Sequence, residues 1–101
     1  MEYSSKSDGT TYIVAFNGKL EFSDNEAVQK IINEVNNQNC TQCRIDLSGL
    51  QGIDSAGLGM LLLMNEMIDI GSNKLELKSP SGQVLKMLEI SNFSSIVTIS
   101  P

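Results

Sequence analysis

The stretch that decides the fold runs from residue 43 to residue 59 and reads CRIDLSGLQGIDSAGLG. Its first five residues have the pattern of a strand, and the apolar run that begins at Leu58 has the length of a helix. Ser55 lies between them, where a helix N-terminus exposes N–H groups and favours negative charge. Such a serine is an N-cap, a nucleophile or a phosphate acceptor, and the choice among these decides the function.

Two of the chemical roles open to Ser55 conflict with its neighbours. A nucleophile elbow needs glycine where the chain has Ile53, and it needs a histidine base, whereas the chain has no histidine. A phosphate-binding loop finds its glycines at Gly52 and Gly57, but Leu58 stands where that loop requires lysine. The sequence therefore predicts a protein that is not an enzyme, with no catalytic residue, cofactor or metal. Ser55 can cap the helix, which stabilises the helix by about 1 kcal/mol. This role is compatible with that of a phosphate acceptor.

Composition and charge narrow the class of protein. With 101 residues, 41% apolar and 19% charged, the chain suits one globular domain spanning residues 1–101. Its formal charge of −5 and its single arginine disfavour nucleic-acid binding, and an anionic membrane surface repels it. The polar residues 1–11 lack a signal-peptide core, and no apolar run approaches the roughly 20 residues of a membrane span. A cytoplasmic protein without direct membrane insertion is expected.

Cys40 and Cys43 form a C-x-x-C motif whose surroundings differ from those of a redox pair. A redox motif opens a helix, where the dipole lowers the thiol pKa, but this motif leads into a strand. Without histidine or further cysteines, one chain cannot complete a four-ligand zinc site. The motif is expected to be structural, with Cys43 pointing into the core.

Strand and helix patterns alternate along the chain. Strands are expected at 12–16, 43–47, 74–78 and 96–99, and helices at 24–37, 56–70 and 82–90. Turns or breaks are expected at Asn17-Gly18, 36–39, 48–52, 71–73, 79–81 and Asn92, and residues near the N-terminus complete a hairpin edge. The order predicts an α/β fold in one domain, with a mixed four- to five-stranded sheet and three to four helices.

The first two helical segments distribute their apolar residues differently. In 24–37, which Ser23 or Asp24 can cap, one stripe contains Val28, Ile31, Ile32 and Val35. In 56–70, the arc expected to face the core contains Met60, Leu63, Met64, Met67 and Ile68. Leu58 and Leu62 fall on the opposite side with Asn65, Glu66 and Asp69. Such residues are often mere scatter, but beside a loop serine they predict a small docking patch for a protein partner.

The run from Arg44 to Gly59 resembles the signature of STAS domains of the anti-sigma factor antagonist type. That signature is a strand, Asp-Leu-Ser, a short apolar loop and Asp-Ser-x-Gly-Leu, matched here by Asp46-Leu47-Ser48 and Asp54-Ser55-Ala56-Gly57-Leu58. The similarity covers nearly the whole chain. Gly18-Lys19-Leu20-Glu21 resembles an early Gly-Glu-Leu-Asp turn, and 74–79, 84–88 and 91–93 match the later strand, helix and turn.

The resemblance implies a mechanism of partner switching. Proteins of this type bind an anti-sigma factor with serine kinase activity and so release a sigma factor; the kinase then phosphorylates the loop serine, and a serine phosphatase restores it. Carried onto this sequence, Ser55 is the phosphorylated residue. The implied partner-binding residues are Glu21, Asp54, Ser55, Ala56, Gly57, Leu58 and Leu62. A phosphate on Ser55 is expected to add bulk and charge beside Asp54, Glu21 and Asp46.

The early turn departs from the family pattern, which keeps a second function open. Glu21 stands where the family usually has aspartate, and Phe22-Ser23-Asp24 replaces its common His/Thr-rich helix start. The alternative is a constitutive STAS subunit of a membrane transport or lipid-trafficking complex. In such a complex the same loop packs on an ATPase subunit, and phosphorylation plays no part.

Overall fold

The computed structural model of the protein describes residues 1–70 and 75–101. In these two described ranges, five strands form one sheet in the order β1-β2-β3-β4-β5. Their bounds are β1 Glu2–Asp8, β2 Thr11–Leu20, β3 Gln42–Ile53, β4 Leu75–Lys78 and β5 Thr98–Ser100. β1 pairs antiparallel with β2, and the other neighbours pair parallel. The predicted mixed α/β sheet with a hairpin edge is confirmed.

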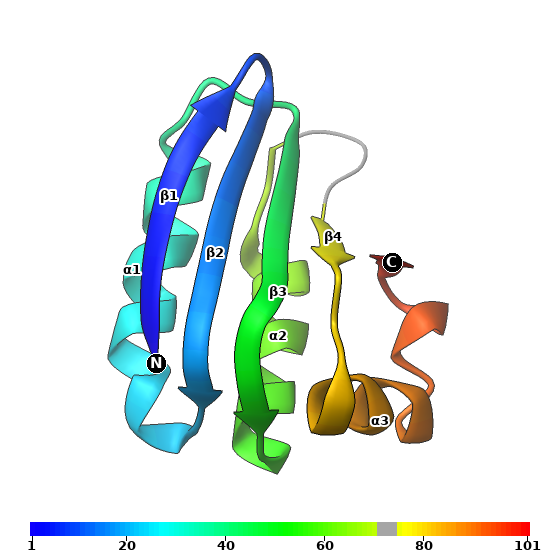
Figure 1. Ribbon diagram of the computed structural model, residues 1–101. Helices are drawn as coiled ribbons and strands as arrows, with labels where there is room; N and C mark the ends of the chain where they lie inside the picture. The colour runs from blue at the N-terminus through cyan, green and yellow to red at the C-terminus, as the bar shows by residue number, and fades with distance from the viewer. Residues whose placement is uncertain (71–74) are drawn as a thin grey trace.

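Three α-helices and two short 3-10 helices connect the strands in the described part of the chain: α1 Asn25–Asn36, α2 Ser55–Met67, α3 Gly82–Ile90, η1 Phe22–Asp24 and η2 Phe93–Ser95. α1 and α2 lie side by side on one face of the sheet, and the opposite face carries neither of them (Figure 1). α3 lies at the end of the sheet where the long strands β2 and β3 finish (Figure 1). The carboxyl ends of these strands, the start of α2 and α3 therefore share one rim of the molecule.

Two predicted turns are instead parts of long strands. Asn17-Gly18 lies inside β2, where the register against β3 shifts and Gly18 adopts a φ of +90°. The predicted loop 48–52 belongs to β3, because Asn17 pairs with Gly49 and Leu20 pairs with Ile53. A side chain at Gly49 is excluded there, since its Cβ would lie 2.9 Å from the Phe16 carbonyl oxygen. Parallel pairing between β2 and β3 provides backbone hydrogen bonds for these residues, and a bulge accommodates the shift in register. Each segment has the sequence of a turn, but the pairing makes it part of a strand.

The core lies between the sheet and the two helices on its covered face. The predicted apolar stripe of α1 is confirmed, because all four of its members are buried. In α2, however, the buried residues are Gly57, Met60, Leu61 and Met64, so Leu61 is a core residue that the predicted arc omitted. Met67 was wrongly placed in that arc, since it is 53% exposed, and Leu63 is only half-buried. Close approach of Gly57 to β2 sets the rotation of the helix and turns Leu61 inward.

The remaining helix and strand boundaries can be compared with those predicted from the sequence. α2 ends at Met67, three residues before the predicted end, where the Asn36 side chain accepts from Asp69 N at 2.7 Å and donates to Met67 O at 3.0 Å. The predicted break at 71–73 lies outside the described residues. The bounds of α3 are those predicted, and Asn92 forms the predicted turn with a φ of +56°. The last strand begins at Thr98, two residues later than predicted.

The two cysteines differ in their surroundings. Cys43 is fully buried in β3, and burial raises the pKa of its thiol to about 12, which keeps it protonated and unreactive. Cys40 is half-buried ahead of the strand. The prediction that Cys43 points into the core is confirmed. Within the described residues, no helix has both the length and the apolar character needed to cross a membrane.

Candidate functional site

The loop between β3 and α2 carries the candidate site at the rim of the sheet. Asp54 is the N-cap of α2, in an extended conformation (φ −103°, ψ −177°), and its carboxylate accepts from Gly57 N at 2.7 Å. The prediction of Ser55 as N-cap is therefore wrong, because the helix begins one residue earlier, at Ser55 itself. Asp54 takes the role because its extended backbone places its carboxylate within reach of the N–H groups of the first turn.

Ser55 is consequently exposed at the first helical position, and its hydroxyl is not used for capping. The N–H groups of Ser55 and Ala56 are among the first four of the helix, which have no partner within it. Negative charge placed on the hydroxyl meets these groups and the positive end of the helix dipole. The site is thus built to tolerate an anion on this side chain.

Gly57 fixes how closely the loop approaches β2. A Cβ at this buried position would lie 2.3 Å from the Leu20 carbonyl oxygen and 2.8 Å from Ile53 Cγ1. Because both neighbours belong to paired strands, neither can retreat without disturbing the sheet. Glycine is therefore required, and the contact brings the first turn of α2 against the end of β2, next to Glu21.

Gln83 of α3 holds the other side of the loop. Its side-chain oxygen accepts from Ile53 N at 2.8 Å, and its side-chain nitrogen donates to Ile53 O at 2.9 Å. Ile53 pairs with Leu20 of β2 on one side, and the amide thereby pairs with it on the other side, where β4 does not extend. Gln83 was not predicted from the sequence, because a contact between side chain and backbone across 30 residues leaves no local pattern.

The predicted partner-binding residues divide into two groups. Glu21 and Asp54 are exposed and line one open depression of about 310 Å³, together with Lys19, Gln51, Gly52, Ile53 and Gln83. Ala56, Leu58 and Leu62 are half-buried, and both leucines pack against the edge of the core. The leucine patch therefore exposes less apolar surface than expected.

Two further residues change the outline of the site. Asp46 does not belong to it, because this residue lies in the middle of β3 and lines the open face of the sheet instead. The suggestion that it flanks Ser55 is wrong, since the seven residue steps of strand from Asp46 to Ile53 span roughly 23 Å. Phe22, next to Glu21, is 73% exposed and supplies the apolar surface that the leucines do not.

Solved structures share the fold of this chain. A Thermotoga maritima crystal structure assigned as an anti-sigma factor antagonist is 23% identical with a TM-score of 0.86, covering 98% of this chain and 86% of that one. An anti-sigma factor antagonist from Mycobacterium paratuberculosis is 16% identical with a TM-score of 0.85, covering 99% and 85%. The antagonist SpoIIAA is 18% identical in its unphosphorylated form (TM-score 0.79, covering 99% and 89%). In its phosphorylated form, described as a Bacillus cell fate determinant, it is 17% identical (TM-score 0.68, covering 99% and 92%).

The sequence itself identifies the family. No curated protein matches the chain significantly. A family model described as "Mlab, STAS domain" matches residues 4–98, which is nearly the whole chain. The match includes β3 and α2, between which the Ser55 loop lies, and also α1 and α3. The chain therefore belongs to the STAS domain family.

Proposed function

We propose that the protein is a cytoplasmic anti-sigma factor antagonist of a partner-switching system. In its unphosphorylated form it binds an anti-sigma factor with serine kinase activity and so releases a sigma factor. Phosphorylation of Ser55 ends the binding, and a serine phosphatase restores it. The observation that carries the proposal is the exposed Ser55 hydroxyl at the first position of α2, which capping leaves available because Asp54 is the cap.

The surroundings of Ser55 support its role as an acceptor rather than a nucleophile. The chain has no histidine, and the nearest carboxylate in sequence, Asp54, is engaged with Gly57 N. A kinase supplies its own base and needs only an accessible hydroxyl on a rigid loop. Gln83 and Gly57 supply that rigidity from both sides.

Phosphorylation is expected to change the surface and spare the fold. A phosphate adds about −1.5 to −2 charge at neutral pH. The free N–H groups at the start of α2 stabilise this charge locally. Toward a partner, the phosphate joins the carboxylates of Asp54 and Glu21 and creates an acidic rim next to Phe22. An interface that requires this rim therefore fails while the domain stays folded.

The test uses the full chain with phosphoserine installed at Ser55 during translation. Its binding to each serine-kinase anti-sigma factor encoded in the same genome is measured by calorimetry, beside the unmodified chain. We expect one kinase to bind the unmodified chain and to bind the phosphorylated chain at least about tenfold more weakly, since like charges across an interface cost several kcal/mol. With ATP, that kinase adds one phosphate to the wild type and none to Ser55→Ala.

Phosphoserine at Ser7 is the matched control. Ser7 is also exposed, but it lies in β1 at the opposite end of the sheet, so the same charge there is expected to leave binding unchanged. Equal binding of the Ser55-phosphorylated and unmodified chains, or equal phosphate transfer to Ser55→Ala, contradicts the proposal.

The alternative is a constitutive STAS subunit of a membrane transport or lipid-trafficking complex. The family model that matches the chain is described as "Mlab, STAS domain" and its description names no anti-sigma factor antagonist, so this second class of function stays open. In that case the protein purified from its own cells carries no phosphate on Ser55, and an ATPase subunit binds the phosphorylated and unmodified chains equally. Mass spectrometry of the native protein therefore separates the two functions.

A further inference from the structure

The open face of the sheet carries two rows of side chains that run across the strands. Strand pairing sets Lys6, Ile13, Arg44, Glu76 and Thr98 in one row. It sets Ser4, Ala15, Asp46, Lys78 and Ser100 in the next. Neither α1 nor α2 lies on this face (Figure 1). These side chains therefore face outward from the sheet and are independent of the Ser55 loop.

A cavity of about 330 Å³ lies over these rows. Its lining comprises Ser4, Ser5, Lys6, Ile13, Ala15, Arg44, Asp46 and Lys78. Ile13 and Ala15 of β2, which lies between β1 and β3, form an apolar floor between the charged side chains of those two strands. Ala15 and Ser4 are short, which explains why the face is hollowed at this point.

The charge of this lining is opposite to that of the protein. Three of the seven basic residues of the chain, Lys6, Arg44 and Lys78, line the cavity against one acid, Asp46. The lining therefore carries a formal charge of three minus one, or +2, in a chain whose net charge is −5. Lys6 and Arg44 stand two strands apart, roughly 10 Å between backbones, so their long side chains can approach one ligand from both sides.

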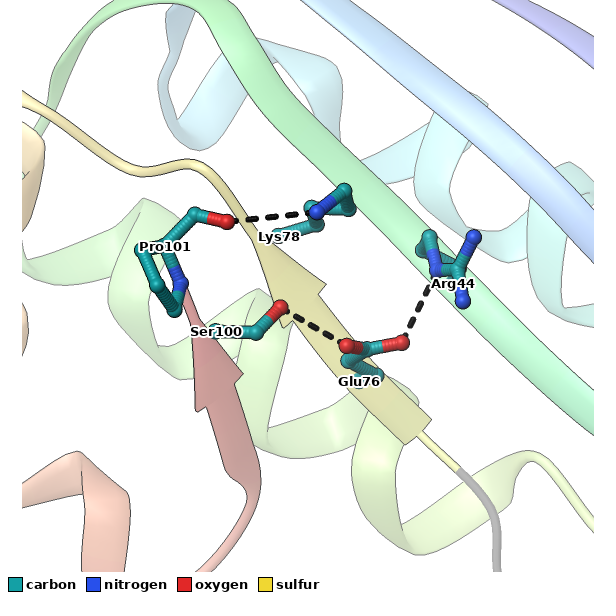
Figure 2. Close-up of polar contacts among 5 residues, drawn as sticks. All are labelled: Arg44, Glu76, Lys78, Ser100 and Pro101. Atoms are coloured by element: carbon teal, nitrogen blue, oxygen red, sulfur yellow. Dashed lines mark hydrogen bonds and ion pairs between the residues drawn. The ribbon is translucent and has the colours of Figure 1, made fainter.

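Arg44, the one arginine of the chain, is held in place for such a contact. Its Nε donates to Glu76 Oε1 at 2.8 Å, and the other oxygen of that carboxylate accepts from Ser100 Oγ at 2.7 Å (Figure 2). The two terminal nitrogens of the guanidinium make no contact with the residues drawn in Figure 2. A guanidinium fixed through Nε keeps the forked donor pair that binds oxyanions bidentately.

We propose that this cavity binds a small phosphate monoester from solution. The phosphate lies between Lys6 and Arg44, and an apolar substituent covers Ile13 and Ala15. The dianion of such a ligand, at about −1.5 to −2, is attracted by this lining, which stays net positive, at +1, when the Glu76 carboxylate paired with Arg44 is counted with it. Asp46 faces the same cavity, with one oxygen accepting from Ser48 N at 2.9 Å, and its other oxygen disfavours a second anionic group on the ligand.

The test is an NMR titration of the full chain with two probes, inorganic phosphate and phenyl phosphate. We expect saturable shifts at Ser4, Lys6, Arg44 and Lys78, including the Arg44 side-chain Nε–H. Phenyl phosphate is expected to bind more tightly, because its ring covers the apolar floor. Lys6→Gln and Arg44→Gln are each expected to weaken binding about tenfold, since each removes a charge-assisted hydrogen bond.

Lys30→Gln is the matched control, because it removes the same charge from α1 on the other face of the sheet. It is expected to leave both affinities unchanged. Arg44→Gln also removes the Arg44–Glu76 ion pair and can disturb the sheet. Lys6 takes part in neither ion pair found in the described residues, so Lys6→Gln tests the site without this side effect. Shifts that stay linear in probe concentration, or equal losses in Lys6→Gln and Lys30→Gln, overturn the proposal.

Discussion

The covered and open faces of the sheet use the same strands for different purposes. Under α1 and α2 the side chains are apolar and closely packed, and among the described residues no polar or charged side chain is buried. The open face carries charged side chains of both signs, among them the ion pair Arg44–Glu76. The Ser55 loop lies at the rim where the two faces meet. Stability is therefore expected to depend on the covered face, and recognition on the rim and the open face.

The largest effect is expected from Leu61, which is fully buried in α2. Leu61→Ala removes core atoms and leaves a cavity, so it is expected to lower the free energy of unfolding by about 2–5 kcal/mol. Met67→Ala is the control from the outward side of the same helix, with an expected loss within about 0.5 kcal/mol. Denaturant unfolding measures both. Similar losses in the two variants would contradict the inward orientation of Leu61 and the outward orientation of Met67.

Gly57 and Gly59 give a second comparison, within one turn of α2. Gly57→Ala places a Cβ against the backbone of β2 and is expected to destabilise by about 1–3 kcal/mol. Gly59→Ala meets no described atom within 4 Å and improves helix propensity, so it is expected to stabilise by about 0.5–1 kcal/mol. Thermal unfolding distinguishes the two by the sign of the shift in Tm. A stabilising Gly57→Ala contradicts the close contact with β2.

Sequence reasoning succeeds where a pattern is local and strong. The α1 stripe and the bounds of α3 follow from helical spacing and end signals, and the structure has both as predicted. The order of strands and helices was also enough to predict a mixed sheet, because short connections between elements allow only a few topologies. These features depend on neighbours within a few residues, which the sequence displays directly.

Prediction from the sequence fails where a contact with a distant segment determines which of several local structures forms. Ser48 to Gly52 resemble a loop until β2 supplies their hydrogen bonds. Asp54 and Ser55 are both good caps, and the strand geometry selects the first. Gln83 gives no signal at all, because its partner is 30 residues away. At the candidate site, the sequence therefore located the loop, but the structure assigned the roles within it.

Gln83 allows a test of the rim, where the two faces meet. Gln83→Ala leaves the N–H and C=O of Ile53 without their side-chain partner, and it is expected to cost about 1–2 kcal/mol, because water replaces part of the loss. Hydrogen exchange is expected to speed up at the Ile53 amide and at the first turn of α2. Gln51→Ala, at an exposed position lining the same depression, is the control and is expected to change neither. Unchanged exchange at Ile53 in Gln83→Ala contradicts a positioning role for α3.

The smallest effect is expected on the open face, at Glu76. The hydrogen bond from Arg44, and then that from Ser100, lower the pKa of this carboxyl below its ordinary value of 4.5. A carboxyl whose pKa is lowered by folding stabilises the folded state above its unfolded pKa, and this contribution is lost as the pH falls through the folded pKa. The wild type is therefore expected to lose more stability than Glu76→Gln between about pH 5 and pH 3.

The difference between wild type and Glu76→Gln is expected to be smaller than any effect above, because the pair lies on the solvent-facing side and water screens it. Raising the salt concentration from about 0.05 to 0.5 M is expected to reduce this difference in stability further. Denaturant unfolding across this pH range measures both dependences. Parallel pH profiles for the two chains would mean that the ion pair does not hold Arg44. The open face would then lack the fixed guanidinium on which its anion binding depends, while the covered face would keep the fold unchanged.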